Sequence, residues 1–99
     1  WRCLVSGGRD VSSSTYGFEK EPINDDNNRE LVHFANAIAK DLDVGDPAYM
    51  LDVAMVGGEF KVVELNCLST SGVYALSPDA VADAWISALN HVYLEFYAF

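Results

Sequence analysis

Two pairs of adjacent glycines, each lying between two runs of strand-forming residues, constrain the fold of this chain most. Residues 1–6 and 11–18 flank Gly7-Gly8-Arg9-Asp10, and residues 48–56 and 60–66 flank Gly57-Gly58-Glu59. Short glycine-containing loops between such runs are typical of β-hairpins, because glycine readily adopts the backbone angles that tight turns require. The sequence therefore predicts two hairpins.

An amphipathic helix is expected after each hairpin. From about Asp26 to Asp43 apolar residues recur at three-to-four spacing, and Gly45 and Pro47 prevent the helix from continuing. Ser77-Pro78-Asp79 predicts the second helix, because it supplies a capping hydroxyl, a proline in the first turn and an acid facing the helix dipole. The apolar stripe of this helix, which we expect in the core, is Val81, Trp85, Leu89 and Val92.

The order of these elements, ββαββα, indicates an α+β fold. We expect a mostly antiparallel sheet with both helices packed on one face and the other face open. The length of 99 residues corresponds to one small domain, and a hydrophobic content of 51% is sufficient for a core. We therefore expect residues 1–99 to form a single domain. Because the chain starts at Trp1 rather than Met, we expect it to be a piece of a longer protein.

The excess of acidic residues limits the partners of the chain. The formal net charge is −9, from 15 acidic and 6 basic residues, and such a surface repels nucleic-acid phosphates and anionic lipid. No apolar run reaches the ~18 residues of a membrane span. We therefore expect no nucleic-acid or membrane partner. No signal peptide is visible, and Cys3 and Cys67 lie in apolar segments, so we expect reduced, buried thiols and a cytoplasmic protein.

The length of the second glycine loop decides which side chains share a face of the sheet. A two-residue turn would place Asp52 opposite Val63, so that Asp52 and Glu64 would lie on opposite faces. A three-residue loop, Gly57-Gly58-Glu59, would place Asp52 directly opposite Glu64 and collect the apolar residues of both strands on the other face. We predict the three-residue loop, since only this register gives a coherent core.

Two carboxylates on adjacent strands repel each other, so a neighbouring group must offset their charge. A shared proton, a basic side chain or a divalent ion would each do so. Asn66, two residues beyond Glu64, adds an amide oxygen to the same face. Oxygen ligands with incomplete protein coordination suit Mg²⁺, which makes Asp52, Glu64 and Asn66 candidate metal ligands. The simpler interpretation of the same residues is a solvated sheet face.

Three segments carry a resemblance to a known family. Leu51-Asp52-Val53-Ala54 is followed by Val63-Glu64-Leu65-Asn66, which leads into a loop of small residues, and Trp1-Arg2 precedes an apolar strand. An acid on one strand, E-x-N on the next and an arginine-bearing strand before them resemble the ATP-grasp superfamily, most closely its R2K-type clade. The resemblance covers the C-terminal half or so of a complete ATP-grasp domain.

The resemblance implies an ATP-dependent carboxylate–amine ligase, in which ATP phosphorylates a carboxylate and an amine or other nucleophile then displaces the phosphate. The implied cofactors are ATP and one or two Mg²⁺ ions. Asp52 and Glu64 would hold one ion, and Glu64 and Asn66 would hold the second. The implied substrate is a small carboxylate and amine pair, with an amino acid or peptide as the default acceptor.

The resemblance also implies roles for residues beside the metal ligands. Arg2 would contact the γ-phosphate or the acyl phosphate, and Ala54 would lie under the nucleotide base. Ser69, Ser71 and Gly72 would meet phosphate and acceptor. The simpler interpretations are an ion-pairing role for Arg2 and a helix lead-in for the serines.

Part of the superfamily pattern has no counterpart in this chain. The lysines and the hinge that hold adenine and the α-phosphate are absent, and Tyr16-Gly17 occupies the region where related domains often carry a second basic residue. We therefore expect a missing N-terminal part of the same protein to complete the nucleotide site and the isolated chain to be inactive. The alternative function is a non-catalytic interaction module that retains the ATP-grasp fold.

Overall fold

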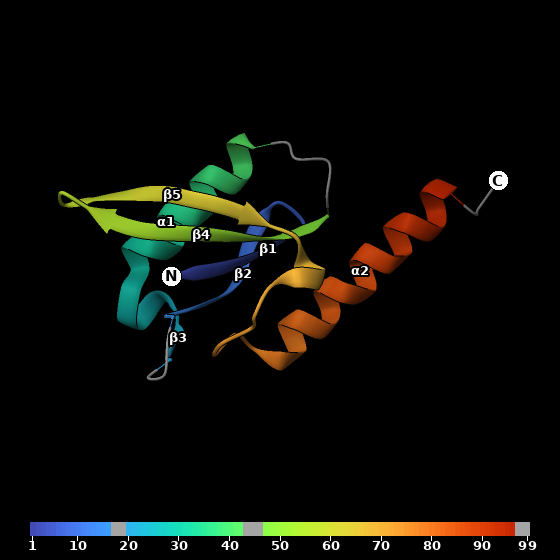
Figure 1. The fold of residues 1–99 in the computed structure, drawn as a ribbon, viewed down its shortest axis with the longest axis horizontal. Helices are drawn as coiled ribbons and strands as arrows, with labels where there is room; N and C mark the ends of the chain where they lie inside the picture. The colour runs from blue at the N-terminus through green and yellow to red at the C-terminus, as the bar shows by residue number, and fades with distance from the viewer. Residues whose placement is uncertain (17–19, 43–46, 97–99) are drawn as a thin grey trace.

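The predicted hairpins and helices are present in the computed structural model, which describes residues 1–16, 20–42 and 47–96 (Figure 1). Its elements are β1 (Arg2–Ser6), β2 (Arg9–Ser14), β3 (Pro22–Ile23), α1 (Asp25–Asp41), β4 (Ala48–Val56), β5 (Glu59–Asn66), the 3-10 helix η1 (Leu68–Thr70) and α2 (Pro78–Phe96). Within the described residues, five strands form one antiparallel sheet in the order β3-β2-β1-β4-β5. The predicted α+β fold is confirmed, and the short β3 is an addition to the expected order.

Local side chains explain where both helices begin. The Asn24 side chain accepts hydrogen bonds from the backbone of Asp26 and Asn27, and the Asn27 side chain accepts one from the Asn24 backbone, which forms a capping box. At α2 the Ser77 hydroxyl accepts a hydrogen bond from the backbone N–H of Ala80 at 3.3 Å, as the predicted cap requires. Helix α1 ends two residues before the expected Asp43, which lies outside the described residues together with Gly45.

Both hairpins close with a two-residue Gly-Gly turn. Gly7 and Gly8 have φ angles of 65° and 80°, and Gly57 and Gly58 have φ angles of 60° and 82°. The strand residues that flank each pair of glycines face each other directly. Two successive positive φ angles are typical of the type I′ turn, whose twist matches that of the two strands. The two hairpins are therefore built alike.

The predicted three-residue loop Gly57-Gly58-Glu59 is wrong, although the pairing that it was expected to produce is present. The loop consists of the two glycines only, and Asp52 nevertheless pairs with Glu64. The register shifts next to Asp52 because Val63 is an extra residue in β5 without a partner in β4, which is a β-bulge. The bulge, rather than an odd loop length, therefore places Asp52 opposite Glu64.

The apolar residues of β5 and of the end of β4 are more exposed than expected. Val63 and Leu65 of the edge strand β5, and Met55 near the end of β4, were expected on a buried apolar face, yet all three are exposed. Cys67, which directly follows β5, is a free and exposed thiol, whereas Cys3 is free and buried as expected. The core therefore lies around the central strands β1 and β4 rather than across the second hairpin.

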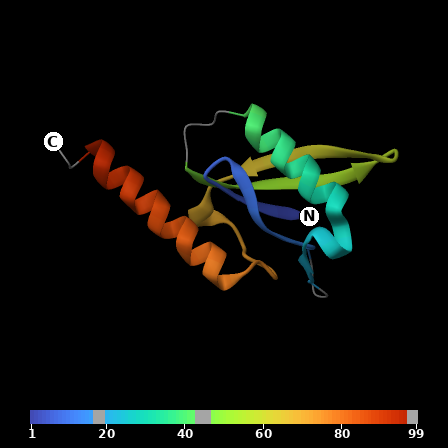
Figure 2. The ribbon, with the colours of Figure 1, turned by 180° about the vertical axis from the view of Figure 1, so that it is seen from behind.

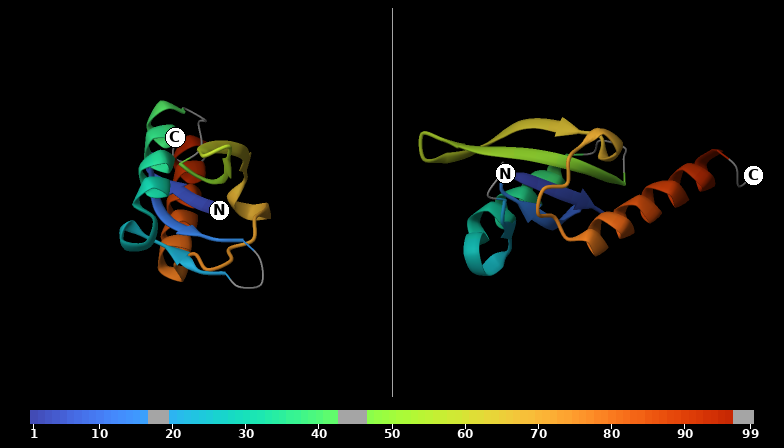
Figure 3. Two further views of the ribbon diagram at one scale, coloured as in Figure 1. Left: turned by 90° about the vertical axis from the view of Figure 1, so that its left-hand side faces the viewer. Right: turned by 60° about the horizontal axis from the view of Figure 1, so that its bottom comes forward.

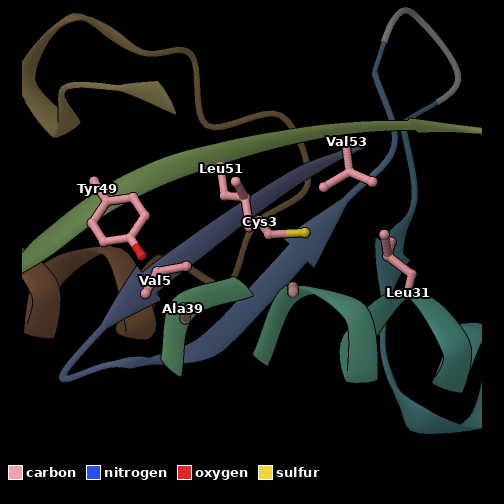
Figure 4. Close-up of a cluster of buried hydrophobic side chains, with 8 residues drawn as sticks. Cys3, Val5, Leu31, Ala39, Tyr49, Leu51 and Val53 are labelled. Carbon is pink, nitrogen blue, oxygen red and sulfur yellow. The ribbon is translucent and has the colours of Figure 1, made fainter. Parts of the chain in front are cut away.

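The two helices pack against opposite faces of the sheet, which differs from the expected placement of both on one face. Seen from behind, α1 lies across the sheet (Figure 2). Its core residues are Leu31, Ala35 and Ala39, which pack with Cys3, Val5, Tyr49, Leu51 and Val53 (Figure 4). On α2, Ala84 packs with Leu4, Ala48, Met50 and Leu76. Neighbouring residues of a strand point to opposite faces, so the two clusters form separate layers.

The reason for this arrangement lies in the two central strands. Residues 2–5 of β1 and 48–53 of β4 are buried without interruption. A strand that is buried on both faces needs cover on both faces, and one helix on each side provides it. Helix α2 covers only part of its face of the sheet, since Trp85 and Leu89, which were expected in the core, are 40% and 62% exposed. Helix α2 extends away from the sheet in Figures 1 and 3, and the side chain of Val92 lies outside the described part.

In the part of the chain that the structure describes, no helix combines the length and the hydropathy that a membrane-spanning segment requires.

The geometry of the second turn predicts that substitutions at Gly57 and Gly58 affect stability differently. Gly58→Ala should lower the free energy of unfolding by about 1 kcal/mol, because an L-residue is strained at a φ of 82° and the space around the added methyl group is open. Gly57→Asn is the matched control and should change stability much less, since Asn-Gly is favoured in type I′ turns. Urea unfolding followed by circular dichroism measures both, and equal losses would contradict the turn assignment.

Candidate functional site

Three adjacent strands bring an arginine and two acids into one row across the sheet. Arg2 of β1 pairs with Asp52 of β4, and Asp52 pairs with Glu64 of β5. Directly paired residues project from the same face of a sheet, and here that face is the one opposite α1. Asn66 lies two residues beyond Glu64 on β5. The structure thus brings together the four residues at which phosphate and metal contacts were predicted.

The Asp52 carboxylate is held by a bidentate ion pair. Arg2 donates from Nε to Oδ1 and from Nη2 to Oδ2, each at 2.8 Å. The Asn66 side-chain Nδ2 donates to the same Oδ2 at 2.7 Å. Arg2 is 7% exposed and Asp52 is 1% exposed, so the pair is shielded from solvent. A shared proton, a basic side chain or a divalent ion was expected to offset the charge of the acids. At Asp52 the structure shows a basic side chain, Arg2.

The pKa values of both partners shift in the directions that keep the pair charged. Burial by itself would raise the pKa of Asp52, but the hydrogen bonds and charge of Arg2, together with the interaction with Tyr16, outweigh burial and lower it. The hydrogen bonds to Asp52 raise the pKa of Arg2. Burial, followed by the nearby Asp52 carboxylate, raises the pKa of the Tyr16 phenol. The site therefore contains a permanent ion pair at neutral pH.

The rings of two tyrosines contact the arginine. The Arg2 guanidinium carbon lies 5.5 Å from the centre of the Tyr16 ring and 5.4 Å from the centre of the Tyr74 ring. The two rings meet edge to face, with centres 4.9 Å apart. The Gly72 carbonyl oxygen accepts a hydrogen bond from Arg2 Nη1 at 3.0 Å. Tyr16 and Tyr74 are 58 residues apart in sequence, so no local pattern could have indicated this arrangement.

The loop after β5 carries the three residues at which substrate contacts were predicted. It runs beside β1 and β2 before α2 begins (Figure 3), where Ser14 and Ser12 hydroxyls accept hydrogen bonds from the backbone of Ala75 and Ser77. In this loop the Gly72 carbonyl contacts Arg2. The Ser71 hydroxyl donates to the Cys67 carbonyl at 2.7 Å, and Ser69 is exposed in η1.

A hollow of about 520 Å³ lies beside the row of charged residues. Its lining residues are Trp1, Thr15, Tyr16, Val53, Ala54, Met55 and Val63. Most of these side chains are apolar, and Ala54 is two residues from Asp52 on the same strand. The hollow therefore suits a flat, apolar group held next to the ion pair.

These features agree with the comparison with known protein families. A family model for an ATP-grasp domain, R2K clade family 3, matches residues 1–86. The chain belongs to this ATP-grasp family. Membership implies an ATP-dependent function of the ligase type, and it confirms the resemblance to the R2K clade that the sequence indicated. No curated protein and no solved structure matches this ATP-grasp chain significantly.

ATP-grasp domains in general bind ATP together with Mg²⁺, so the oxygen donors of this chain can be compared with that requirement. Glu64 is exposed, and Asn66 uses its amide nitrogen on Asp52, which leaves its amide oxygen for another partner. Asp52 has the right chemistry, but three of its roughly four acceptor positions are already used. Among the described residues, no three His, Cys, Asp or Glu side chains gather as they would around a metal ion. The donors therefore fit Mg²⁺ in kind, with Glu64 and Asn66 the most accessible.

The ion pair predicts a pH-dependent contribution to stability. Asp52→Asn should lower the free energy of unfolding by about 3–5 kcal/mol at pH 7, because it leaves the Arg2 charge buried without a counter-ion. The pKa of Asp52 is lower in the folded state than in the unfolded state. Its contribution is therefore complete above the unfolded pKa of about 3.9 and is lost as the pH falls through the folded value.

Urea unfolding of the wild type and of Asp52→Asn between pH 7 and pH 2 measures this effect. The difference between the two proteins should narrow at the acid end. Glu59→Gln is the control, because it breaks the exposed Glu59–Lys61 pair and should have a much smaller effect at every pH. A difference for Asp52→Asn that does not change with pH would contradict the assigned direction of the pKa shift.

Proposed function

We propose that this domain is the magnesium- and ATP-phosphate-binding part of an ATP-dependent carboxylate–amine ligase that acts through an acyl-phosphate intermediate. The observation that carries the proposal is the convergence of Arg2, Asp52, Glu64 and Asn66 on neighbouring strands, beside a hollow lined by Ala54. Family membership supplies the reaction class, and the acceptor in the proposal is an amino acid or peptide.

In this proposal Asp52 and Glu64 hold one Mg²⁺ ion, and Glu64 and Asn66 hold a second. Rotation of the Asn66 side chain would release Asp52 Oδ2 from its hydrogen bond and turn the amide oxygen of Asn66 toward the same space. The bidentate contact with Arg2 does not have to break in this rearrangement. Bound Mg²⁺ neutralises phosphate charge during phosphoryl transfer.

Arg2 is the proposed contact for the γ-phosphate or the acyl phosphate. Three of its five N–H groups donate to Asp52 and Gly72. The other two, one on each terminal nitrogen, donate to neither of these groups. A guanidinium held in this way presents its remaining donors in a fixed direction, which favours the binding of a developing oxyanion.

The remaining contacts come from the hollow and from the loop after β5. Ala54 has a small side chain that leaves room for the nucleotide base against the apolar lining. Ser69, Ser71 and Gly72 provide the proposed contacts for phosphate and acceptor. Ser71 already uses its hydroxyl on the Cys67 carbonyl, which leaves backbone groups of this loop as the donors of interest.

The proposal treats residues 1–99 as one C-terminal subdomain of a longer cytoplasmic protein. The contacts to adenine and the α-phosphate would come from an N-terminal part that closes the other side of the nucleotide. The free thiols of Cys3 and Cys67 are compatible with a reducing compartment.

Glu64 is the ligand whose loss should be most informative. In the full-length protein, calorimetry with Mg²⁺ and a non-hydrolysable ATP analogue should show binding that Glu64→Ala weakens by at least about tenfold. Glu59→Ala removes an exposed carboxylate from the same strand and serves as the matched control, with an expected affinity equal to that of the wild type. Unchanged affinity in Glu64→Ala would refute the metal assignment and favour the non-catalytic interaction module.

The proposed division of the nucleotide site predicts that residues 1–99 alone do not catalyse the reaction. Measurement of ATP-dependent phosphate release by the isolated chain should give no turnover above background, because only one side of the nucleotide would be bound. The full-length protein, tested with candidate amino acids and peptides, is the positive control. Turnover by the isolated chain would show that the proposed subdomain boundary is wrong.

A further inference from the structure

The guanidinium group of Arg2 is held from several directions at once. Asp52 accepts two of its hydrogen bonds, the Gly72 carbonyl accepts a third, and the rings of Tyr16 and Tyr74 lie within 5.5 Å of its carbon. Cation–π attraction is stronger when the cation is desolvated, and Arg2 is almost fully buried. These contacts come from three separate parts of the chain, namely β4, the segment just after β2 and the loop after β5.

Arg2 therefore connects the loop after β5 to the sheet. Gly72 and Tyr74 belong to the loop, whereas Asp52 belongs to a central strand of the sheet. The loop is also joined to the sheet by Leu76, which packs with Leu4 and Met50, and by single hydrogen bonds from the backbone N–H groups of Ala75 and Ser77 to the hydroxyls of Ser14 and Ser12. The contacts with Arg2 are the ones that combine charge, burial and aromatic surface.

The backbone of Tyr74 indicates that its ring is required in this place. Tyr74 has a φ of 45°, and it is the one non-glycine residue with positive φ among those described. A residue with a large side chain is strained in this region, and glycine would be the easiest choice. Strained residues persist where the surrounding contacts hold them, and they gather at functional sites. The contacts that hold Tyr74 are those of its ring with Tyr16 and Arg2.

We propose that Tyr16 and Tyr74 are positioning residues, whose adjoining rings both pack against the Arg2 guanidinium and thereby dock the loop of residues 67–77 on the sheet. We call this set of contacts the clamp. The clamp fixes the direction of the two remaining N–H groups of Arg2. It also places Ser69, Ser71 and Gly72 at a constant distance from the acids of the sheet. The effect on nucleotide binding rests on the proposed function, whereas the docking of the loop does not.

Hydrogen exchange measured by mass spectrometry on the full-length protein tests the clamp. Tyr74→Phe keeps the ring and should leave the exchange of the amides of residues 73–77 unchanged. Tyr74→Leu keeps the bulk but loses the aromatic face, and it should accelerate this exchange by at least about tenfold. Val73→Ala alters an exposed neighbour in the same loop and should behave as the wild type.

Tyr74→Gly separates the role of the ring from that of the backbone. Glycine relieves the strain at a φ of 45°, so a loop held only by its backbone would exchange as slowly as in the wild type, or more slowly. A loop held by the ring would exchange faster, as in Tyr74→Leu. Wild-type protection in both Tyr74→Gly and Tyr74→Leu would overturn the proposal.

The amides of β4 serve as an internal reference for folding, because they lie in the central part of the sheet. If Tyr74→Leu also loses protection in β4, Tyr16→Leu is compared with the wild type instead, and its loop amides should exchange faster. Tyr16→Phe is not used, because it would also remove the contact of the phenol with Asp52. Equal protection of the loop in Tyr16→Leu and in the wild type would likewise overturn the clamp.

Titration of the same variants with Mg²⁺ and a non-hydrolysable ATP analogue gives the second readout. Tyr74→Leu should bind the ATP analogue more weakly than the wild type does, and Tyr74→Phe should bind it as tightly as the wild type. If the wild type does not bind the nucleotide at all, the proposed function fails, and the exchange data still decide whether the clamp docks the loop. If the wild type binds the ATP analogue and every variant binds it with the same affinity, the clamp has no role in nucleotide binding.

Discussion

The ion pair between Arg2 and Asp52 holds the site together, because it lies where several elements of the chain meet. Each partner would carry an uncompensated buried charge without the other, and such a charge is strongly destabilising. The pair links β1 to β4 directly, reaches β5 through the Asn66 amide, and reaches the loop after β5 through the Gly72 carbonyl. The position of the proposed phosphate and metal contacts therefore depends on one salt bridge.

One face of the sheet carries the larger apolar core, and the other face carries the charged site. Facing α1, the central strands present Cys3, Val5, Tyr49, Leu51 and Val53, which are apolar apart from the Tyr49 hydroxyl, and this layer forms the larger core. The opposite face changes character along its length. Leu4 and Met50 pack under the start of α2, whereas Arg2 and Asp52, at the other end of the same strands, form the charged site. A complete core on one side allows the other side to hold a buried ion pair.

The β-bulge at Val63 shows how a small irregularity decides the chemistry of a strand. With a two-residue turn and a regular ladder, Asp52 would face Val63, and Glu64 would point to the other side of the sheet. The extra residue returns Glu64 to the position opposite Asp52. Bulges frequently redirect side chains next to functional sites, and here the redirected residue is a proposed metal ligand. The pairing of the two acids could be predicted in spite of an incorrect loop length, because a bulge shifts the register by one residue just as an odd loop would.

Local features of this chain could be predicted from the sequence because they depend on residues that are close together. The Gly-Gly turns need positive φ angles, Ser77-Pro78-Asp79 satisfies the first turn of α2, and apolar spacing marks both helices. The family could also be predicted, since an acid on one strand followed by E-x-N on the next is a motif that the sequence itself carries. The pairing of β1 with β4, which brings Arg2 to Asp52, joins the two hairpins and was decided only by the tertiary structure. The tertiary structure decided on which face each helix packs, how Val63 changes the register, and that Tyr16 and Tyr74 both contact Arg2. These features depend on contacts between residues that are distant in sequence, and such contacts exist only after the sheet has formed.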